Sequence, residues 1–224
     1  MSSAESSTSK RRWSLKEFLP SQLNHQLRTS EWQPGGEAEI VGASGEVGLA
    51  AGIIHPIKIL VHGAVGDYAF ALNDGGECEV VGDVGAACGH SMLSGSILVR
   101  GHAGPALGAF AAGGFIALHW AAEARCGMCV AGAEIVIRSD VGPQAGWAMK
   151  SGTLVIGADA KAGLGEGMTG GTIYIRGKAD SPASHLREMR MKDADSLRLG
   201  LLLVRAGIKA DPKDFRIYRT RSGV

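Results

Sequence analysis

Hydrophobic and polar residues alternate in a pattern that returns about every 19 residues between Ile40 and Gly177. Each return contains two aliphatic or β-branched residues separated by one residue, and a residue two positions further on serves as the anchor of that repeat. The anchors are Gly42, Gly63, Gly82, Gly101, Trp120, Ser139, Gly157 and Gly177. A fixed period of this length is the sequence signature of a repeat architecture.

Two rows of residues, four and two positions before the anchors, are almost entirely apolar. The first row is Ile59, Cys78, Ile97, Ile116, Ile135, Thr153 and Ile173, and the second is Val61, Val80, Val99, Leu118, Ile137, Val155 and Ile175. Because the alternation has period two, it predicts one short strand per repeat with both rows facing the core.

The row between them should then face outward, yet it is also largely apolar. It reads Leu60, Glu79, Leu98, Ala117, Val136, Leu154 and Tyr174. An apolar stripe of this length predicts a covered surface, because soluble monomers rarely expose such a patch. The sequence leaves two alternatives for the cover, the chain's own C-terminal helix or a partner subunit.

Glycine recurs at fixed offsets after the anchors, and the chain contains 34 glycines. The recurring positions are Gly66, Gly85, Gly89, Gly104, Gly108, Gly142 and Gly146. Such positions suit tight turns with positive φ, or a close approach of neighbouring coils. No segment inside a repeat has helical periodicity, so we expect an all-β chain wound as a single parallel β-helix of about seven coils, rather than a β-sandwich. Met92, Met149 and Met168 fit one internal row.

The flanking segments predict caps on the two ends of the β-helix. We expect a disordered tail over residues 1–12, a capping segment over 13–39, the β-helix over 40–180, and a helix and arm over 181–224. A capping box at Ser14 predicts a short helix up to Pro20. A second short amphipathic segment should follow from Ser21, with Leu23 and Leu27 on one face.

The C-terminal segment changes abruptly in composition after Pro182. A helix capped at Asp195 or Ser196 is expected to pack through Leu197, Leu201 and Val204 and to stop at Gly207. Residues 214–219 then predict a terminal strand or extended arm. An open β-helix end is an unpaired strand edge, which such flanks would cover.

Composition narrows the functional class. The 224 residues carry a net charge of +1 and 20% charged residues, which argues against a nucleic-acid or polyanion binder. The four cysteines follow no signal peptide, so a reduced cytoplasmic setting is expected. Lys10-Arg11-Arg12 resembles part of a twin-arginine signal, but no apolar run follows it. No stretch approaches the ~20 apolar residues that span a bilayer.

Motifs with known chemistry are incomplete in this chain. Gly163-Leu164-Gly165-Glu166-Gly167 lacks the final glycine of a dinucleotide-binding loop, because Met168 stands there. Gly89-His90-Ser91-Met92-Leu93 lacks the last glycine of a nucleophile elbow. Both motifs are interpreted as β-helix corners.

Cysteines and histidines offer two weaker candidates. Cys126 and Cys129 have the spacing of half a zinc or redox site, but no second pair accompanies them. Cys88 and Cys126 share one register two coils apart, too far for a disulfide. His62 and His119 lie in the outward row before the anchors with Arg100, Arg138 and Arg176, where a solvated polar face or a site for an acidic partner patch are the alternatives. We therefore assign no catalytic, cofactor-binding or metal-binding residue.

The repeat over residues 80–95 resembles the GXGXG domain, the right-handed β-helix at the C-terminus of the glutamate synthase large subunit. The resemblance covers residues 40–180 and implies a single right-handed parallel β-helix. The flanks around Asn24 and Phe215 are more similar to stand-alone subunits of the N-methylglutamate synthase type, also called methylamine-glutamate N-methyltransferase. Trp120, Ser139 and Ala160 depart from the expected glycines, which predicts distorted or partner-specific middle coils.

This resemblance implies a non-catalytic subunit that joins a class II glutamine amidotransferase to an FMN-dependent synthase. FMN and any iron–sulfur cluster would belong to the synthase partner, with no cofactor in this chain. The alternative within the family is the β-helical scaffold of a formylmethanofuran dehydrogenase or of a formyltransferase/hydrolase complex. A self-sufficient enzyme with a groove beside the coils and an unrelated binding solenoid are the rivals outside it.

Overall fold

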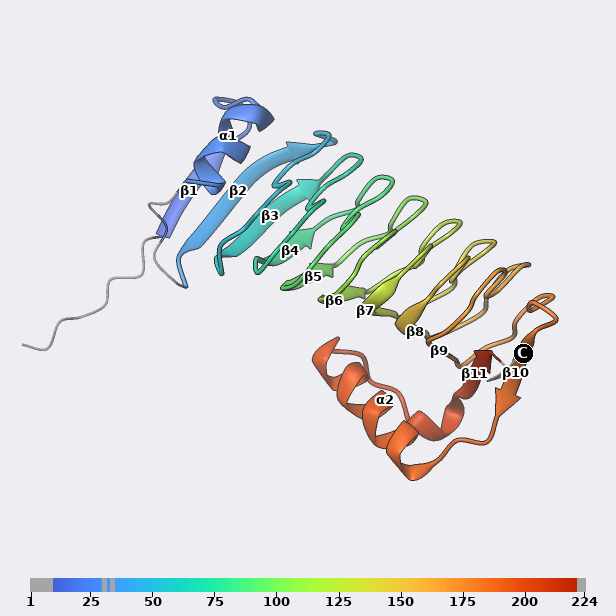
Figure 1. Ribbon diagram of the computed structural model, residues 1–224. Helices are drawn as coiled ribbons and strands as arrows, with labels where there is room; N and C mark the ends of the chain where they lie inside the picture. Colours follow the sequence, from blue (N-terminus) through green and yellow to red (C-terminus); the bar gives the residue numbers. More distant parts are fainter. Residues whose placement is uncertain (1–9, 30–31, 33–34, 221–224) are drawn as a thin grey trace, which may run out of the picture.

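The computed structural model describes residues 10–29, 32 and 35–220, and its strands form one continuous sheet along a parallel β-solenoid (Figure 1). The coils contribute eight parallel strands in chain order, β2 (Glu37–Ser44), β3 (Lys58–Ala64), β4 (Glu77–Val81), β5 (Ser96–Val99), β6 (Phe115–Leu118), β7 (Ala131–Ile137), β8 (Ser151–Ile156) and β9 (Thr172–Ile175). A second column of parallel bridges runs beside the sheet through Val65, Val84, Ala103, Ala122, Val141, Ala160 and Ala179. The all-β solenoid of about seven coils is therefore confirmed.

Pairing between neighbouring coils corrects the predicted register of the eighth strand. Ile135 pairs with Leu154, and Leu154 pairs with Ile173. Leu154 thus lies in the inward row, while Val155 occupies the outward row. Counting back from Gly157 as the anchor predicts that Val155 faces inward and Leu154 outward, and that prediction is wrong. Since side chains alternate with period two, a slip of one residue inverts both faces.

The remaining inward rows are confirmed, and the core runs the length of the solenoid. Met92, Met149 and Met168 are buried in one row, as expected. Asn73 lies in the same row, one coil before Met92, and is fully buried. Its side-chain amide donates to the carbonyl of Gly76 and accepts from the Gly76 N–H, so its polar atoms are satisfied inside an apolar core. The middle coils around Trp120 keep regular pairing, so they are not distorted there, and the alternative of a partner-specific feature stays a prediction.

The turn segments lie across the core from the sheet, because a Cβ on Gly89 would meet the side chains of Ile97 and Ile116 at 2.9 and 3.0 Å. Alternate residues of each turn have positive φ, and many of them are not glycine. They include Tyr68, Phe70, Leu72, Ala87, Ser91, Ala106, Phe110, Arg125, Cys129, Gln144 and Ala148. Their N–H groups donate to carbonyls of the neighbouring coils, as Tyr68 does to Ala86 at 2.8 Å. Stacking of coil on coil therefore holds a conformation that single residues rarely adopt.

The N-terminal segment differs from the prediction. Residues 10–12 belong to strand β1 (Lys10–Ser14), which pairs in parallel with β2, whereas residues 1–9 lie outside the described part. The capping box at Ser14 forms only a turn, because Ser14 itself is held in β1 opposite Val41. Helix α1 (Pro20–Leu27) follows, and its buried Leu23 and Leu27 cover the first coil as expected.

The C-terminal segment closes the other end of the sheet (Figure 1). Strand β10 (Leu186–Met189), helix α2 (Asp193–Arg205), the 3-10 helix η1 (Pro212–Asp214) and strand β11 (Arg216–Thr220) follow the last coil. β11 pairs antiparallel with β9, and β10 pairs antiparallel with β11. The unpaired edge of β9 is therefore covered, as the sequence predicted.

Helix α2 packs through a different face from the one expected. Leu199, Leu202 and Leu203 are buried, whereas the predicted contact residues Leu197, Leu201 and Val204 are 68%, 64% and 79% exposed. Leucines occur on both sides of this helix, so the helical period alone could not select the buried side. Neither helix of the described part is long and apolar enough to cross a membrane.

Candidate interaction surfaces

The outer face of the sheet has two halves that differ in what covers them. Over β6 to β9, the outward residues Ala117, Val136, Val155 and Tyr174 are buried. They form one apolar cluster with the inner side of α2 and with Phe215 and Ile217 of the C-terminal segment. The chain's own helix therefore covers the C-terminal half of the predicted outward stripe, while Leu60 and Leu98 remain only partly buried.

Charged contacts fix α2 on this face. Arg198 and Arg205 both pair with the carboxylate of Glu134, at 3.3 and 3.6 Å, and the Arg205 guanidinium lies 4.1 Å from the centre of the Phe115 ring. At the start of the helix Asp195 accepts a hydrogen bond from Arg219 at 2.6 Å. Burial acts to raise the pKa of Asp195, but this bond and the N–H of Lys192 outweigh burial and leave its pKa below the usual value.

The open half of the sheet forms a groove of about 390 Å³ between β1 and β5. Its lining includes Lys10, Glu37, Lys58 and Glu77, which follow one another across β1 to β4 in register. Opposite charges thus alternate at the spacing of neighbouring strands, and the partly buried Leu60 and Leu98 lie along the same groove. The groove can accept a polar segment with mixed charges.

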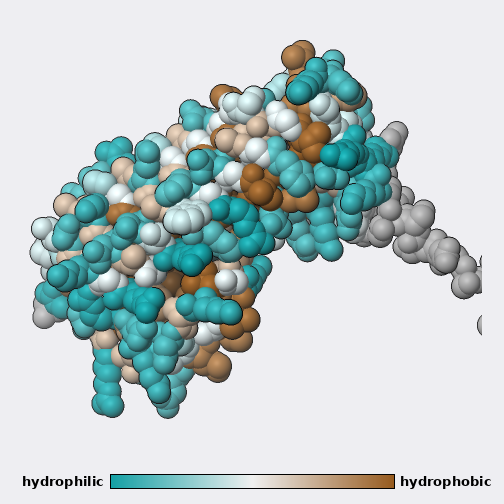
Figure 2. All heavy atoms as spheres, turned by 180° about the vertical axis from the view of Figure 1, so that it is seen from behind, coloured by the Kyte–Doolittle hydropathy of each residue, from teal (hydrophilic) through white to brown (hydrophobic). Residues whose placement is uncertain are grey.

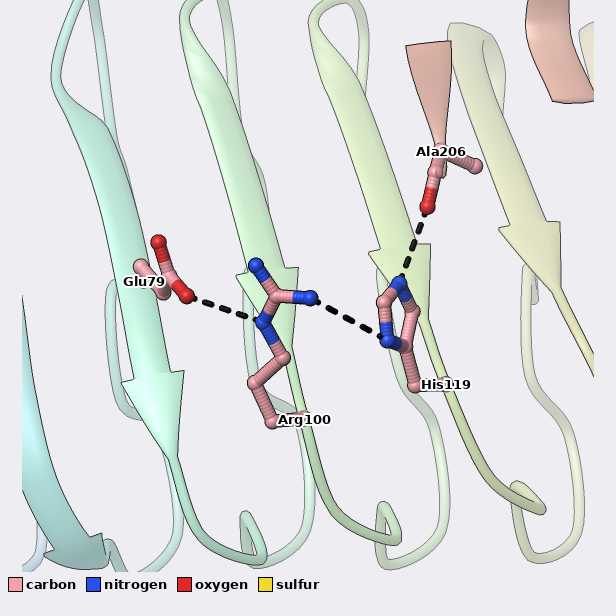
Figure 3. Close-up of polar contacts among 4 residues, drawn as sticks. All are labelled: Glu79, Arg100, His119 and Ala206. Carbon is pink, nitrogen blue, oxygen red and sulfur yellow. Dashed lines mark hydrogen bonds and ion pairs between the residues drawn. The ribbon is translucent and has the colours of Figure 1, made fainter. Parts of the chain in front are cut away.

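The candidate histidines and arginines near the ends of the solenoid strands are mostly engaged within the chain. His62 lies 3.1 Å from Glu39, and Arg176 pairs with Asp214 at 3.1 Å. A chain of contacts runs from Glu79 through Arg100 and His119 to the carbonyl of Ala206 at the end of α2 (Figure 3). In that chain the His119 Nε2 lies 2.9 Å from the Ala206 oxygen. This row therefore ties α2 to the sheet. Arg138 is exposed and has no ion pair within the described part of the chain.

The cysteines do not assemble into a site. Cys88 and Cys126 are fully buried, and burial raises the pKa of each thiol to about 12. Burial also raises the pKa of Cys78. Cys129 is partly exposed, and all four thiols are free. Within residues 10–29, 32 and 35–220, no group of three or more histidine, cysteine or carboxylate side chains lies close enough to hold a metal ion.

The two incomplete motifs lie where the sequence placed them, in turns of the solenoid. Gly89 and Gly165 both have positive φ at equivalent turn positions. The Nδ1 of His90 lies 2.9 Å from the hydroxyl of the neighbouring Ser91 and shares a hydrogen bond with it. The turn therefore contains neither the helix start of a dinucleotide loop nor the strand-to-helix geometry of a nucleophile elbow.

The turn segments display a second surface, which the sequence did not predict. Exposed or partly exposed side chains of adjacent coils form what we name the turn ridge, consisting of Tyr68, Leu72, His90, Leu93, Phe110 and Trp147. The rings of Tyr68, His90 and Phe110 follow one another with centroids 5.8 and 5.3 Å apart. Trp120 is also exposed and stacks on His102 at another corner of the coils.

Similarity to known proteins is partial. The chain is 32% identical over 85 residues to Protein GlxC of Rhizobium meliloti (strain 1021). The matched segment makes up 38% of this chain and 36% of that relative, so the chain spans about a third of the length of the curated relative. No family model matches the chain.

Proposed function

We propose that this chain is a β-helical subunit of a glutamate-synthase-related enzyme complex. The observation that carries the proposal is a regular solenoid with exposed apolar side chains on two separate surfaces, the turn ridge and the outer side of α2. Solvent-facing apolar residues on a rigid support are typical of subunit contacts. The resemblance of the repeat to the GXGXG domain and the partial similarity to Protein GlxC support the glutamate-synthase-related assignment.

In its finer form the proposal is a complex of the N-methylglutamate synthase type. This chain would join a class II glutamine amidotransferase subunit to an FMN-binding synthase subunit, and the chemistry would take place in those partners. FMN and an iron–sulfur cluster would be held by the synthase subunit. The solenoid would fix the distance and orientation between the two active sites.

Co-expression tests this function directly. The chain is produced with an amidotransferase-like chain and a synthase-like chain taken from its own genome, and a tag on the solenoid recovers any complex that forms. We expect all three chains in fixed proportion, a flavin spectrum in the complex, and glutamine-dependent product formation only when all three are present. Recovery of formyltransferase-type chains instead, or amide-transfer activity in the lone solenoid, would overturn the proposal.

A further inference from the structure

The outer side of α2 carries an apolar stripe that nothing in the described structure covers. Leu197, Leu201 and Val204 are spaced four and three residues apart, so they lie on one side of the helix, and each is more than 60% exposed. The opposite side of α2 is already buried against the sheet. A helix that is apolar on both sides is ordinarily enclosed on both sides.

The stripe borders a recess rather than a flat surface. A trough of about 350 Å³ is lined by Glu134 of β7 and by residues of α2, namely Ala194, Leu197, Arg198, Leu201, Leu202 and Arg205. In the space-filling view, hydrophobic side chains gather on the edge of the C-terminal lobe that borders a hollow in the surface (Figure 2). The apolar stripe and the trough together give a second helix a place to pack.

The charges along the stripe indicate the occupant. Arg198 and Arg205, half-exposed and one heptad apart, lie on the same flank of the stripe, and they share the single carboxylate of Glu134. Two guanidinium groups facing one carboxylate leave this flank positive. Ser196 and Gly200 lie on the other flank, where a Cβ on Gly200 would meet only Pro212, at 3.6 Å. The arginine flank therefore attracts carboxylates, and the flank with Ser196 and Gly200 allows the backbone of a second helix to approach closely.

The same charges argue against a second copy of this chain. In an antiparallel two-fold pair of helices, equivalent flanks face each other, so the arginines of one copy would face those of the other. Three aliphatic side chains also supply only part of the roughly 800 Å² that each partner of a stable dimer buries. Charge and area together favour a different protein chain.

We propose that the outer side of α2 is a docking site for an amphipathic helix of a partner subunit, with carboxylates flanking its aliphatic stripe. The aliphatic side chains of that helix pack against Leu197, Leu201 and Val204, and its carboxylates pair with Arg198 and Arg205. The identity of the partner as a subunit of the enzyme complex rests on the proposed function, whereas the chemistry of the docking site does not.

A peptide experiment tests the site independently of the complex. The probe is a three-heptad helical peptide with leucines on one side and glutamates along both flanks, and the comparison peptide has lysines in place of those glutamates. We expect the full chain to bind the glutamate peptide at least tenfold more tightly than the lysine peptide in fluorescence anisotropy, and less tightly as salt is raised. Leu201→Glu should abolish this binding, and Arg198→Gln should reduce the preference.

The matched control is Ile54→Glu, because Ile54 is as exposed as Leu201 but lies in the first coils, away from α2. Both variants should keep the wild-type melting temperature, since neither side chain is buried. Equal binding of the two peptides, or equal loss of binding in the Leu201 and Ile54 variants, would overturn the docking site. A lone chain that is dimeric in light scattering and becomes monomeric on Leu201→Glu would show that the occupant is a second copy, which also overturns the proposal.

The complex itself supplies the second arm of the test. If the wild-type chain recovers its proposed partners, Leu201→Glu should lose one of them while Ile54→Glu keeps both. If the Leu201 variant recovers both partners as well as the wild type does, α2 is not the docking site. If the wild-type chain recovers neither, the proposed function fails, and the peptide result alone decides the site.

Discussion

Replacing Gly85 tests why the solenoid needs glycine at its corners. The sequence pattern left positive φ and close approach of neighbouring coils as alternative reasons for Gly85 and Gly104, and neither residue has positive φ. Instead, a Cβ on Gly85 would lie 2.6 Å from the backbone nitrogen of Asp67 and 2.6 Å from the carbonyl carbon of Gly66, both in the preceding coil. Ordinary contacts begin at 3.4 Å, so the shortfall is about 0.8 Å. We infer that this glycine serves close stacking of coils.

The cost of Gly85→Ala follows from the contacts around it. Separation of the two coils would stretch three hydrogen bonds, from Gly85 N–H to Val65, from Val65 N–H to Asp83, and from Ala86 N–H to the Asp67 carboxylate. At ~0.5–1.5 kcal/mol each, their loss costs about 1.5–4.5 kcal/mol. Overpacking adds about 1–3 kcal/mol. We expect a loss of at least about 2.5 kcal/mol, which lowers the melting temperature by at least about 5 °C.

Gly48 provides the matched control. It has a φ of +67°, and no atom lies within 4 Å of the position that a Cβ would occupy there. Gly48→Ala should cost only the left-handed backbone strain of about 1–2 kcal/mol. Asparagine tolerates positive φ better than alanine, so Gly48→Asn should be milder than Gly48→Ala. At Gly85 the order should reverse, since asparagine is larger. Thermal unfolding followed by circular dichroism measures all four variants. If Gly85→Ala is no worse than Gly48→Ala and the order does not reverse, close approach is not the reason for the glycine.

Four further outcomes are expected. Cys129 should react with a thiol reagent in the folded chain, while Cys78, Cys88 and Cys126 should react only after unfolding. Rapid modification of more than one thiol would contradict the burial of these three cysteines. Asp195→Asn should lower stability by about 1.5–3 kcal/mol at pH 7. Because the folded pKa of Asp195 is depressed, its stabilisation is present above the usual carboxyl pKa and is lost as pH falls through the folded value, so the stability difference between wild type and variant should shrink as the pH is lowered below the usual carboxyl pKa. In urea unfolding, Val136→Glu should lower the stability of the lone chain several times more than Leu60→Glu, because only Val136 lies under α2. Equal losses of stability would contradict the burial of Val136 by α2. The lone chain should retain no flavin after gel filtration, and a flavin spectrum that survives would place the cofactor in this subunit.

Local sequence was sufficient for the main architecture. A 19-residue period of alternating aliphatic residues can bury its apolar rows only by stacking coil on coil, so Ile97, Val99 and their equivalents determine a parallel β-solenoid. The amphipathic pair Leu23 and Leu27 likewise determined a cap on the first coil. The composition after Pro182 indicated that a helix and a strand would end the array.

The candidate surfaces depended on tertiary structure. Leucines occur on both sides of α2, so only the shape of the sheet beneath it decided that Leu199 is buried and Leu201 exposed. The bulky left-handed residues of the turns, such as Phe110, leave no local signal, because hydrogen bonds to neighbouring coils hold them in that conformation. The register of β8 was set by its pairing with β7 and β9, not by the glycine nearest to it. A periodic sequence fixes which residues repeat, but contacts between distant segments decide which of two equally apolar faces is covered.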